Sequence, residues 1–442
     1  MSTTAPDNQA QQQDPSALIP QAERIRALVG SAVGSVVEWY DFFLYGTMSA
    51  IVFGPLFFPS DDPVVSQLLA LTAFALSFLL RPIGGVVFSH MGDRIGRKKT
   101  LVITLSLMGV ATVAIGLLPT YAQIGVAAPI LLTVMRMIQA IALGGEWGGG
   151  LLMAVEYSPA KRRGFYGAIP QTGALFGLAL GNLATSATSS LFPGDSFYTI
   201  GWRIPFLASV VLILVGLWVR KAVDETPHFR AVVASRKTEK LPIVAIFKRN
   251  WREVLIVIGA KAIETGTFFL YATFTVSYLV DHGFERTDAL NAVLVAAVIA
   301  IPVMLLIGGL SDRTSRKLIY GVGTVLAMAY AIPYFWLLDH KTWGMAVLAL
   351  VLGFSVIWSF VGSTLGSYFA ESFPSAVRYT GVSLGYQVGA ALFGGSLPAI
   401  ATALVAAYDS ALPVGLLVMG YGLLSLIAVA FTKDKTGQPL AE

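Results

Sequence analysis

The sequence contains no cysteine and unusually little charge. Only 12% of its 442 residues are Asp, Glu, Lys or Arg, about half of the roughly 25% that is usual in soluble domains. A chain without cysteine can form neither a disulfide framework nor a thiolate metal or redox site. The sequence also lacks a Gly-x-x-x-x-Gly-Lys-Ser/Thr loop, which argues against an ATP-driven pump or another nucleotide-dependent enzyme. We expect no metal site and no cofactor, because the few histidines lie near predicted span ends or in loops.

Hydrophobic residues make up 55% of the chain, and the mean hydropathy is +0.72. Apolar runs of about 20 residues recur from Leu28 to Phe431, and a run of that length is the signature of a membrane-spanning helix. The pattern predicts an all-α membrane protein with twelve spans, at residues 27–53, 65–90, 99–118, 124–156, 165–190, 203–220, 251–280, 288–310, 317–338, 344–370, 379–406 and 411–431.

Charged residues divide sharply between the two sets of connecting loops. One set holds most of the Lys and Arg, including Arg94, Arg163 and Arg378, whereas the other holds mostly acids such as Asp61 and Asp281. Because Lys and Arg accumulate in cytoplasmic loops, both termini are predicted in the cytoplasm, with the spans in a bacterial inner membrane. This topology accounts for the net charge of +5 without nucleic acid as a partner.

Two motifs occur twice, about half a chain apart. "GDRIGRKKT" after the second span returns as "SDRTSRKLI" after the eighth, and the Glu-x-x-Pro-x-x-x-Arg spacing that begins at Glu156 returns at Glu371. Two similar six-span halves in the same orientation form the parallel-repeat architecture of a large class of transporters. The predicted organisation is a disordered tail at 1–25, six-helix bundles at 26–220 and 251–432 with a linker at 221–250 containing some amphipathic helix, and a tail at 433–442.

These motifs resemble the major facilitator superfamily. Its signature loop, Gly-x-x-x-Asp-Arg-x-Gly-Arg-Arg/Lys, is similar to "SHMGDRIGRK", where Ser89 replaces the usual first Gly, and to "GGLSDRTSRK", where Ser315 replaces the later Gly. More narrowly, "VGSVVEWYDFFLYG", "RPIGGVVF", "GGEWGGG", "WRIPF" and "FPSAVRYTG" look like the metabolite:proton symporters. That family carries shikimate, α-ketoglutarate, citrate and betaine or proline. The resemblance implies twelve helices in two bundles related by a pseudo-two-fold axis.

Two carboxylates lie inside the first span. Glu38 and Asp41 are three residues apart and share one helical face, and each costs on the order of 2.5–3.5 kcal/mol in a bilayer unless it is paired or protonated. The expected partner of Asp41 is Arg136 of the fourth span, an arrangement similar to that of proton-driven sugar carriers. We expect protonation of Asp41 to free Arg136 for a substrate carboxylate. Both acids are expected to face the central cavity, with Glu38 as a further proton-coupling residue. The alternatives are a static salt bridge between Asp41 and Arg136 and, for either acid, a buried hydrogen bond that anchors helix packing.

Further candidates lie in both halves. Glu146 of "GGEWGGG" is either a second titrating group or a hydrogen-bonded structural acid, and neighbouring Trp147 is expected to be apolar bulk. In the seventh span, Lys261 and Glu264 can satisfy each other locally, Lys261 can snorkel to the cytoplasmic face, or the pair can bind an anion as in shikimate-type carriers. The remaining candidate substrate-binding residues are polar or aromatic: Tyr40, Tyr45, Gln171, Tyr271, Trp358, Tyr386 and Gln387.

Charged residues at the predicted cytoplasmic edge are expected to form a latch between the bundles. Such a latch would hold one conformation, breaking when the protein opens inward, and would govern rate without selecting the substrate. Arg81 and Arg203 lie near predicted span ends, where both side chains can snorkel, and no function is assigned to them. The predicted latch residues are Asp93, Arg94, Arg97, Glu156, Arg163, Asp312, Arg313, Arg316, Glu371 and Arg378.

Together these features predict a monomeric, proton-coupled symporter that takes up a small carboxylate, such as a hydroxy acid, a dicarboxylate or a shikimate-like compound. The partners are the substrate, protons and the lipid bilayer. A zwitterion carrier for betaine or proline is the alternative, with Glu38 or Glu264 facing the cationic head. A proton-driven exporter would need a larger, more apolar cavity and fits the intramembrane charges less well.

Overall fold

A computed structural model describes residues 19–234 and 242–440 of the chain, which form helices and loops without strands. The first half contains a long helix α1 (Gln21–Met48) that continues through η2 (Ser49–Phe53) into α2 (Gly54–Phe57). Short helices α5 (Tyr121–Ile124), η3 (Ala160–Arg162) and η4 (Phe197–Gly201) lie in its connections. The other long helices of this half are α3 (Pro63–Ile95), α4 (Arg97–Leu117), α6 (Ala127–Glu156), α7 (Arg163–Leu191) and α8 (Arg203–Lys221).

The second half repeats this plan, with several spans broken by π-helical turns. Its seventh span joins α11 (Trp251–Phe269), η5 (Leu270–Phe274) and α12 (Thr275–Asp281), and its tenth joins α15 (Trp343–Leu350), η6 (Val351–Ile357) and α16 (Trp358–Ser372). The eleventh span consists of α17 (Arg378–Phe393) and α18 (Leu397–Tyr408). The unbroken spans are α13 (Arg286–Arg313), α14 (Arg316–Leu338) and α19 (Leu412–Ala430).

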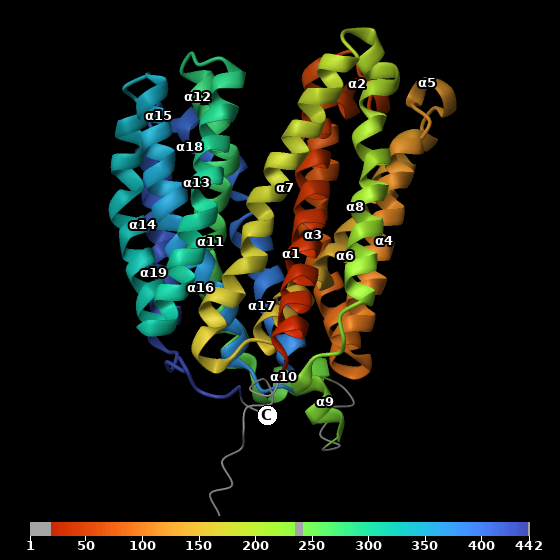
Figure 1. The fold of residues 1–442 in the computed structure, drawn as a ribbon. Helices are drawn as coiled ribbons and strands as arrows, with labels where there is room; N and C mark the ends of the chain where they lie inside the picture. The colour runs from red at the N-terminus through yellow and green to blue at the C-terminus, as the bar shows by residue number, and fades with distance from the viewer. Residues whose placement is uncertain (1–18, 235–241, 441–442) are drawn as a thin grey trace, which may run out of the picture.

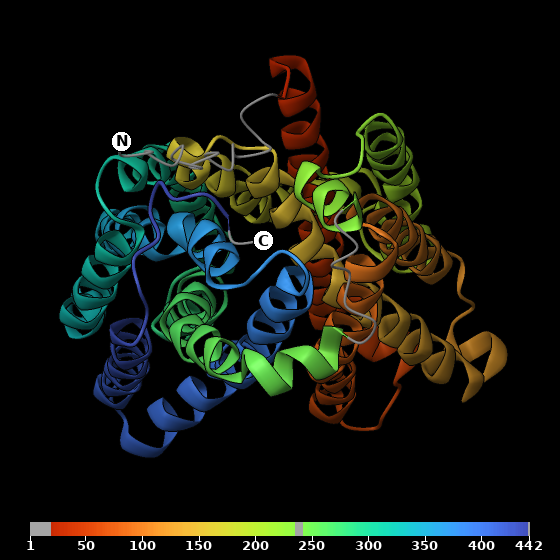
Figure 2. The same cartoon turned by 90° about the horizontal axis from the view of Figure 1, so that it is seen from below.

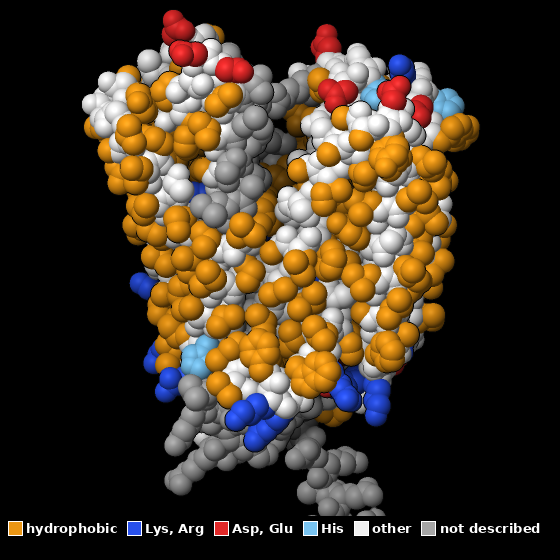
Figure 3. Space-filling view, turned by 180° about the vertical axis from the view of Figure 1, so that it is seen from behind, with side chains coloured by type: hydrophobic (Ala, Val, Ile, Leu, Met, Phe, Trp, Pro, Cys, Tyr) orange, Lys and Arg blue, Asp and Glu red, His pale blue; other side chains and the backbone are white. Residues whose placement is uncertain are grey.

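Ten segments of the described residues are long and apolar enough to cross a membrane. With α3 and α7, which are 33 and 29 residues long, they make up the predicted twelve spans. Large apolar side chains such as Val110 and Leu306 are about 70% exposed, as expected of helices that face lipid. Figure 3 shows these side chains covering the middle of the molecule, with Lys and Arg gathered at one end and most acids at the other.

The twelve spans form two six-helix bundles, α1–α8 and α11–α19 (Figure 1). They meet where α7 packs on α13 and α16 and where α3 packs on α17. We call the end that carries α9 (Pro227–Ala234) and α10 (Pro242–Arg249) the linker end, and the opposite end the open end. The bundles separate at the open end in Figure 1, and the surface is notched there in Figure 3.

The linker end is closed by close helix contacts and by the linker. A Cβ at Gly164 of α7 would lie 2.5 Å from the carbonyl oxygen of Gly308 in α13, so only glycine permits this approach of the two bundles. Helix α10 contacts both α3 and α17, and Figure 2 shows the linker helices lying across this end. The amphipathic helix predicted in the linker is therefore present, whereas residues 235–241 lie outside the described part.

The predicted tails differ from the structure. Residues 1–18, 441 and 442 lie outside the described part of the chain, but α1 begins at Gln21, four residues before the predicted end of the first tail. The last residues also pack on the protein, since Lys435 Nζ donates to the Glu371 carbonyl oxygen at 3.0 Å and Arg163 donates to the Gln438 carbonyl oxygen at 2.5 Å. The C-terminal tail therefore joins both bundles at the linker end.

The internal repeat extends to how two helices begin. The backbone N–H of Arg97, at the start of α4, donates to Glu225 Oε1 at 3.0 Å, and that of Arg316, at the start of α14, donates to Thr436 Oγ1 at 3.0 Å. Glu225 and Thr436 each follow the last span of their own half. In each half, the segment after the last span thus provides a hydrogen-bond acceptor for the start of the third span, where backbone N–H groups have no partner within the helix.

Candidate functional site

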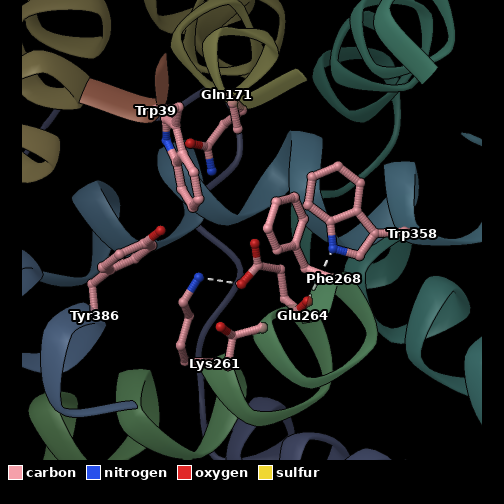
Figure 4. A pocket seen from close by; sticks show the side chains of 9 residues that line it. Trp39, Gln171, Lys261, Glu264, Phe268, Trp358 and Tyr386 are labelled. Atoms are coloured by element: carbon pink, nitrogen blue, oxygen red, sulfur yellow. Dashed lines mark hydrogen bonds and ion pairs between the residues drawn. The ribbon is translucent and has the colours of Figure 1, made fainter. Parts of the chain in front are cut away.

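A small cavity lies between the two bundles (Figure 4). Its volume of about 20 Å³ holds roughly one water molecule, so the site is closed around very little space. Residues from α1, α7, α11, α16 and α17 line the cavity: Trp39, Gln171, Ala174, Lys261, Glu264, Thr265, Phe268, Trp358 and Tyr386. Five of these are among the predicted substrate-binding residues: Gln171, Lys261, Glu264, Trp358 and Tyr386.

Lys261 and Glu264 form an ion pair on one turn of α11 and are both buried. Lys261 Nζ also lies 3.7 Å from the centre of the Tyr386 ring, and the indole N–H of Trp358 donates to the Glu264 carbonyl oxygen at 2.9 Å. Figure 4 shows the amine and the carboxylate pointing toward one another at the cavity wall. Lys261 therefore does not snorkel, and the pair presents both charges to the space between the bundles.

Trp147 links the bundles across the cavity. Its ring stacks on Tyr386 with the ring centres 3.4 Å apart, and its indole N–H donates to Gln171 Oε1 at 3.0 Å. Gln171 in turn donates to the carbonyl oxygen of Gly362 in α16, at 3.3 Å. Trp147 was expected to be apolar bulk, and this expectation is wrong because its ring and its N–H both make specific contacts between the halves.

Asp41 and Arg136 form a second cluster, within the first bundle. Both side chains are buried, and Asp41 Oδ2 lies 3.9 Å from Arg136 Nη1. Asp41 Oδ1 accepts hydrogen bonds from Thr112 Oγ1 at 2.5 Å and from Gln139 Nε2 at 2.9 Å. Arg136 donates to Gln139 Oε1 at 3.3 Å. The structure therefore places the predicted acid and guanidinium together, away from lipid, but neither lines the cavity.

The sequence reasoning missed two members of this cluster, Thr112 and Gln139. Gln139 also donates to Thr112 Oγ1 at 2.8 Å, so the amide and the hydroxyl hold one carboxylate oxygen between α1, α4 and α6. Gln139 lies three residues after Arg136 and shares its helical face, which is the signal that could have identified it. Thr112 gave no such signal.

Glu38 and Glu146 occupy different surroundings. Glu38 is buried, and its Oε2 accepts no hydrogen bond from the described residues, while the charges of Arg81 and Glu146 act on it. Glu146 pairs with Arg220 of α8 and accepts from Thr104 Oγ1 at 2.7 Å. Of the two interpretations left open for Glu146, the geometry is that of a paired acid, and its partner Arg220 was not among the predicted site residues.

Besides Arg136, four predicted binding residues do not line the cavity. Tyr40 donates to the carbonyl oxygen of Pro205 at 2.8 Å, and the Tyr45 ring lies under Arg136 with 4.1 Å from its centre to the guanidinium carbon. Tyr271 packs against Tyr334, and Gln387 donates to the carbonyl oxygen of Gly144 at 3.0 Å. In this conformation packing contacts occupy their side chains, and their role in substrate binding stays a prediction.

Arg81 and Arg203 do not snorkel from span ends. Arg81 is only 4% exposed, and its guanidinium carbon lies 4.7 Å from the centre of the Phe42 ring. Arg203 donates to the carbonyl oxygens of Gly116 and Leu118 at 2.9 and 2.6 Å. The expectation fails for Arg81 because α3 extends from residue 63 to 95, which puts this side chain near the middle of the helix.

An aromatic layer covers the cavity toward the open end. Phe42 and Phe78 of the first bundle meet Phe269 of the second, with ring centres 6.3 and 5.5 Å apart, and Trp39 meets Phe268 at 5.4 Å. These contacts join α1 and α3 to α11. Because these contacts are apolar, separating them would break no ion pair.

The linker end is instead held by charge. Glu156 lies 3.1 Å from Arg378 and 3.5 Å from Arg97, and Asp93 Oδ2 accepts from the Thr380 N–H and hydroxyl at 2.9 and 2.8 Å. The contacts with Arg378 and Thr380 cross from one bundle to the other.

The second copy of the motif makes a matching set of contacts. Asp312 accepts from the N–H groups of Gly164 and Phe165 at 2.7 and 2.9 Å, at the start of α7. Arg316 lies 3.0 Å from Glu371, which is 3.9 Å from Arg163.

Eight of the ten predicted latch residues belong to this network. The exceptions are Arg94 and Arg313, whose side chains are exposed and make no ion pair with the described residues. The prediction included them because they follow the motif aspartates directly, but adjacent residues on a helix point in different directions. Among the described residues, no group of three or more His, Asp or Glu side chains is placed to hold a metal ion.

Comparison with known proteins agrees with this geometry. The family model described as Major Facilitator Superfamily matches residues 32–397. The chain belongs to the major facilitator superfamily. It is therefore a multi-pass membrane transporter and not an enzyme. It has the superfamily fold, since the proton:xylose symporter XylE of Escherichia coli superposes with a TM-score of 0.76 over 95% of this chain and 98% of XylE, at 17% identity.

Curated relatives are transporters of small metabolites. The chain is 38% identical to the inner membrane metabolite transport protein YhjE of Escherichia coli K12, over 95% of this chain and 97% of that protein. It is 37% identical to the shikimate transporter of the same organism, over 86% and 87%. It is 32% identical to the glycine betaine/proline/ectoine/pipecolic acid transporter OusA of Dickeya dadantii, over 97% and 87%. The resemblance to the metabolite symporters is confirmed at this level.

Proposed function

We propose that this protein is a proton-coupled symporter of a small carboxylate, acting as a monomer in a bacterial inner membrane with its linker end and both termini in the cytoplasm. The observation that carries the proposal is the buried Asp41–Arg136 pair. Asp41 Oδ2 lies 3.9 Å from the guanidinium and accepts no hydrogen bond from the described residues. A proton can bind this oxygen while Thr112 and Gln139 still hold the other one.

Protonation changes what holds α1 to α6. The ionised Asp41 attracts Arg136, and this attraction is strong in a dry interior. Neutralising Asp41 removes it and leaves the hydrogen bonds, so the proton alters the relative free energy of two arrangements of these helices. Alternating access then parts either the aromatic layer toward the open end or the charged network at the linker end, while the substrate lies in an enlarged central cavity.

A zwitterion carrier is a second candidate. Three relatives that match at 31–32% identity carry proline or betaine according to their names. The cavity also has an aromatic wall of Trp39, Phe268 and Trp358 beside Glu264, and aromatic faces attract quaternary ammonium groups.

Uptake by the purified full-length protein in liposomes tests the proposal. The probes are shikimate, lactate, succinate and glycine betaine, with the uncharged methyl ester of lactate as a control. We expect at least one acid to accumulate when the lumen is alkaline and a protonophore to abolish the accumulation. Accumulation of glycine betaine alone selects the second candidate. Uptake that is indifferent to the pH gradient, or a preference for bulky apolar cations, contradicts proton-coupled symport.

A further inference from the structure

Arg81 differs from every other buried arginine of the described residues. Six buried arginines lie within 4 Å of a carboxylate: Arg97, Arg136, Arg163, Arg220, Arg316 and Arg378. Arg81, only 4% exposed, makes no such contact with the described residues. A buried guanidinium with no carboxylate in contact is costly, and only the more distant charges of Glu38 and Asp41 among the described residues attract it.

The surroundings of Arg81 provide attraction but no acceptor. Its guanidinium carbon lies 4.7 Å from the centre of the Phe42 ring and 5.2 Å from that of Phe78. Its Nε and Nη2 are buried and donate to no group in the described part of the chain. Ring faces stabilise a cation electrostatically but do not replace the acceptors that a guanidinium fork requires.

Arg136, the arginine that the sequence assigned to the substrate, is already occupied. It donates to Gln139 Oε1 at 3.3 Å and to Ser77 Oγ at 3.4 Å, and it lies 3.9 Å from Asp41. An incoming carboxylate would have to displace these internal partners, whereas at Arg81 it would displace none.

Arg81 also lies near residues that line the cavity, where a substrate would bind. It lies beside Phe42 and Phe78, the rings that meet Phe269 across the bundle interface. The groups whose charges act on Arg81 include Glu38 and Tyr386, and Arg81 itself acts on Lys261. Tyr386 and Lys261 line the cavity. The guanidinium therefore lies within electrostatic reach of Asp41 and of the cavity residues, next to the aromatic layer.

We infer that Arg81 binds the carboxylate of the transported molecule through a two-pronged contact of its guanidinium fork, while Arg136 remains in the coupling cluster. The inference rests on the proposed function and assigns its anion site. A free acid and a zwitterion both present this carboxylate, so the same residue would serve either. A bidentate contact depends on the planar fork, which lysine lacks.

Thermal unfolding of the ligand-free protein in detergent separates a binding role from a structural one. Arg81→Gln removes a buried charge that has no partner, so we expect its melting temperature to equal or exceed that of the wild type. Arg136→Gln is the matched variant, and we expect it to lower the melting temperature by several degrees because it breaks the Asp41 cluster. A clear decrease for Arg81→Gln would mean that Arg81 supports the fold, and would overturn the inference.

Binding measured by tryptophan fluorescence provides the second test, with shikimate, lactate, succinate and glycine betaine as probes. For each probe that the wild type binds, we expect Kd to rise at least tenfold in Arg81→Gln and in Arg81→Lys. We expect Arg136→Gln to stay within threefold of the wild type. Arg81→Lys keeps the charge and serves as the second variant if Arg81→Gln fails to fold.

The outcomes distinguish this inference from the proposed function. If the wild type binds a probe and both Arg81 variants bind it within threefold, Arg81 is not the anion site, although carboxylate transport stands. A loss confined to Arg136→Gln assigns the anion to Arg136 and overturns the inference in the same way. If the wild type binds none of the four carboxylates, the proposed function and the inference fall together.

Discussion

The two bundles repeat each other's helices but not each other's buried charges. Away from the linker end, the described part of the second bundle buries Lys261 and Glu264 on one turn of α11. The corresponding part of the first bundle spreads its charges over α1, α3, α6 and α8, in Glu38, Asp41, Arg81, Arg136 and the Glu146–Arg220 pair.

This difference separates two kinds of ion pair. Lys261 and Glu264 are three residues apart on one helix, so the pair moves with α11 as a unit and its distance is insensitive to how the bundles rearrange. Asp41 and Arg136 lie on different helices, so changing the charge of one changes the contact between α1 and α6. In this account, a pair within a helix serves binding, and a pair between helices serves coupling.

The largest expected effect is that of Asp41→Asn. Because asparagine cannot release a proton, we expect accumulation driven by a pH gradient to fall at least tenfold, while exchange of labelled for unlabelled probe stays within threefold of the wild type. Liposome uptake and counterflow measure the two activities. Asp61→Asn, at an exposed loop carboxylate, is the control and should behave as the wild type. Normal accumulation by Asp41→Asn would show that Asp41 does not couple transport to protons, and the two ion pairs would then not differ in role as described.

The second prediction concerns the pair in α11. Glu264→Gln leaves Lys261 buried without its partner, and removing one member of a buried pair costs about 3–5 kcal/mol. We expect a marked drop in melting temperature that Lys261→Met, added to Glu264→Gln, largely restores, while both variants bind the probe more weakly than the wild type. If the double variant melts no higher than the single one, the pair is not a self-contained unit.

The third prediction tests the packing that supports the first bundle's charges. A Cβ at Gly144 of α6 would lie 2.1 Å from the carbonyl oxygen of Arg81 and 2.5 Å from the Gly85 nitrogen in α3. Since both are backbone atoms, Gly144→Ala must push the helices apart, and we expect a loss of about 1–3 kcal/mol of stability.

Gly321→Ala in α14 is the control for this packing test, because a Cβ there meets nothing within 4 Å. It should leave stability unchanged or raise it by up to about 1 kcal/mol. Equal effects of the two substitutions on the melting temperature would show that close approach of α3 and α6 is not required.

The smallest expected effects are at the repeated helix starts. Removing a side chain that accepts from the first turn of a helix costs about 0.5–2 kcal/mol, so Thr436→Val should lower the melting temperature slightly. Glu225→Gln keeps an amide oxygen as acceptor but loses the charge, so it should lower the melting temperature by less. Of these two residues, only Glu225 should make the free energy of unfolding depend on pH. Burial raises the pKa of its carboxyl, although backbone N–H groups of Thr226 and Arg97 oppose the rise.

The sign of that pH dependence follows from proton binding. Between the ordinary and the raised pKa, the folded state binds more protons than the unfolded state, so the free energy of unfolding falls as pH rises through that window. Melting curves recorded across that range should show this slope in the wild type and in Thr436→Val, and a smaller one in Glu225→Gln. The same slope in all three proteins would contradict the role of Glu225.

Much of the fold followed from the sequence because a bilayer imposes a simple rule. Each span needs about 20 apolar residues, and the predicted limits agree with the observed helices at most ends. The same rule singled out Asp41, Arg136, Lys261 and Glu264, since a charge inside a span demands a partner. The repeated motif similarly identified most of the charged network at the linker end.

The remaining site residues depend on geometry that the sequence does not contain. Thr112 and Gln139 are ordinary helix residues until helix rotation points them at Asp41. Arg81 was misplaced because the predicted second span ended at 90 and the helix continues to Ile95. Tyr40 and Tyr271 carry hydroxyls inside spans, as a binding residue would, yet they turn toward their own bundles.

Simultaneous recording of probe uptake and proton movement in liposomes tests the central claim most directly. With a probe that the wild type accumulates, Asp41→Asn should exchange that probe while moving no protons. Glu264→Gln should transport probe and protons in the wild-type ratio, although at a lower rate. Probe-linked proton movement that persists in Asp41→Asn would contradict the account. So would a changed ratio of protons to probe in Glu264→Gln together with the wild-type ratio in Asp41→Asn.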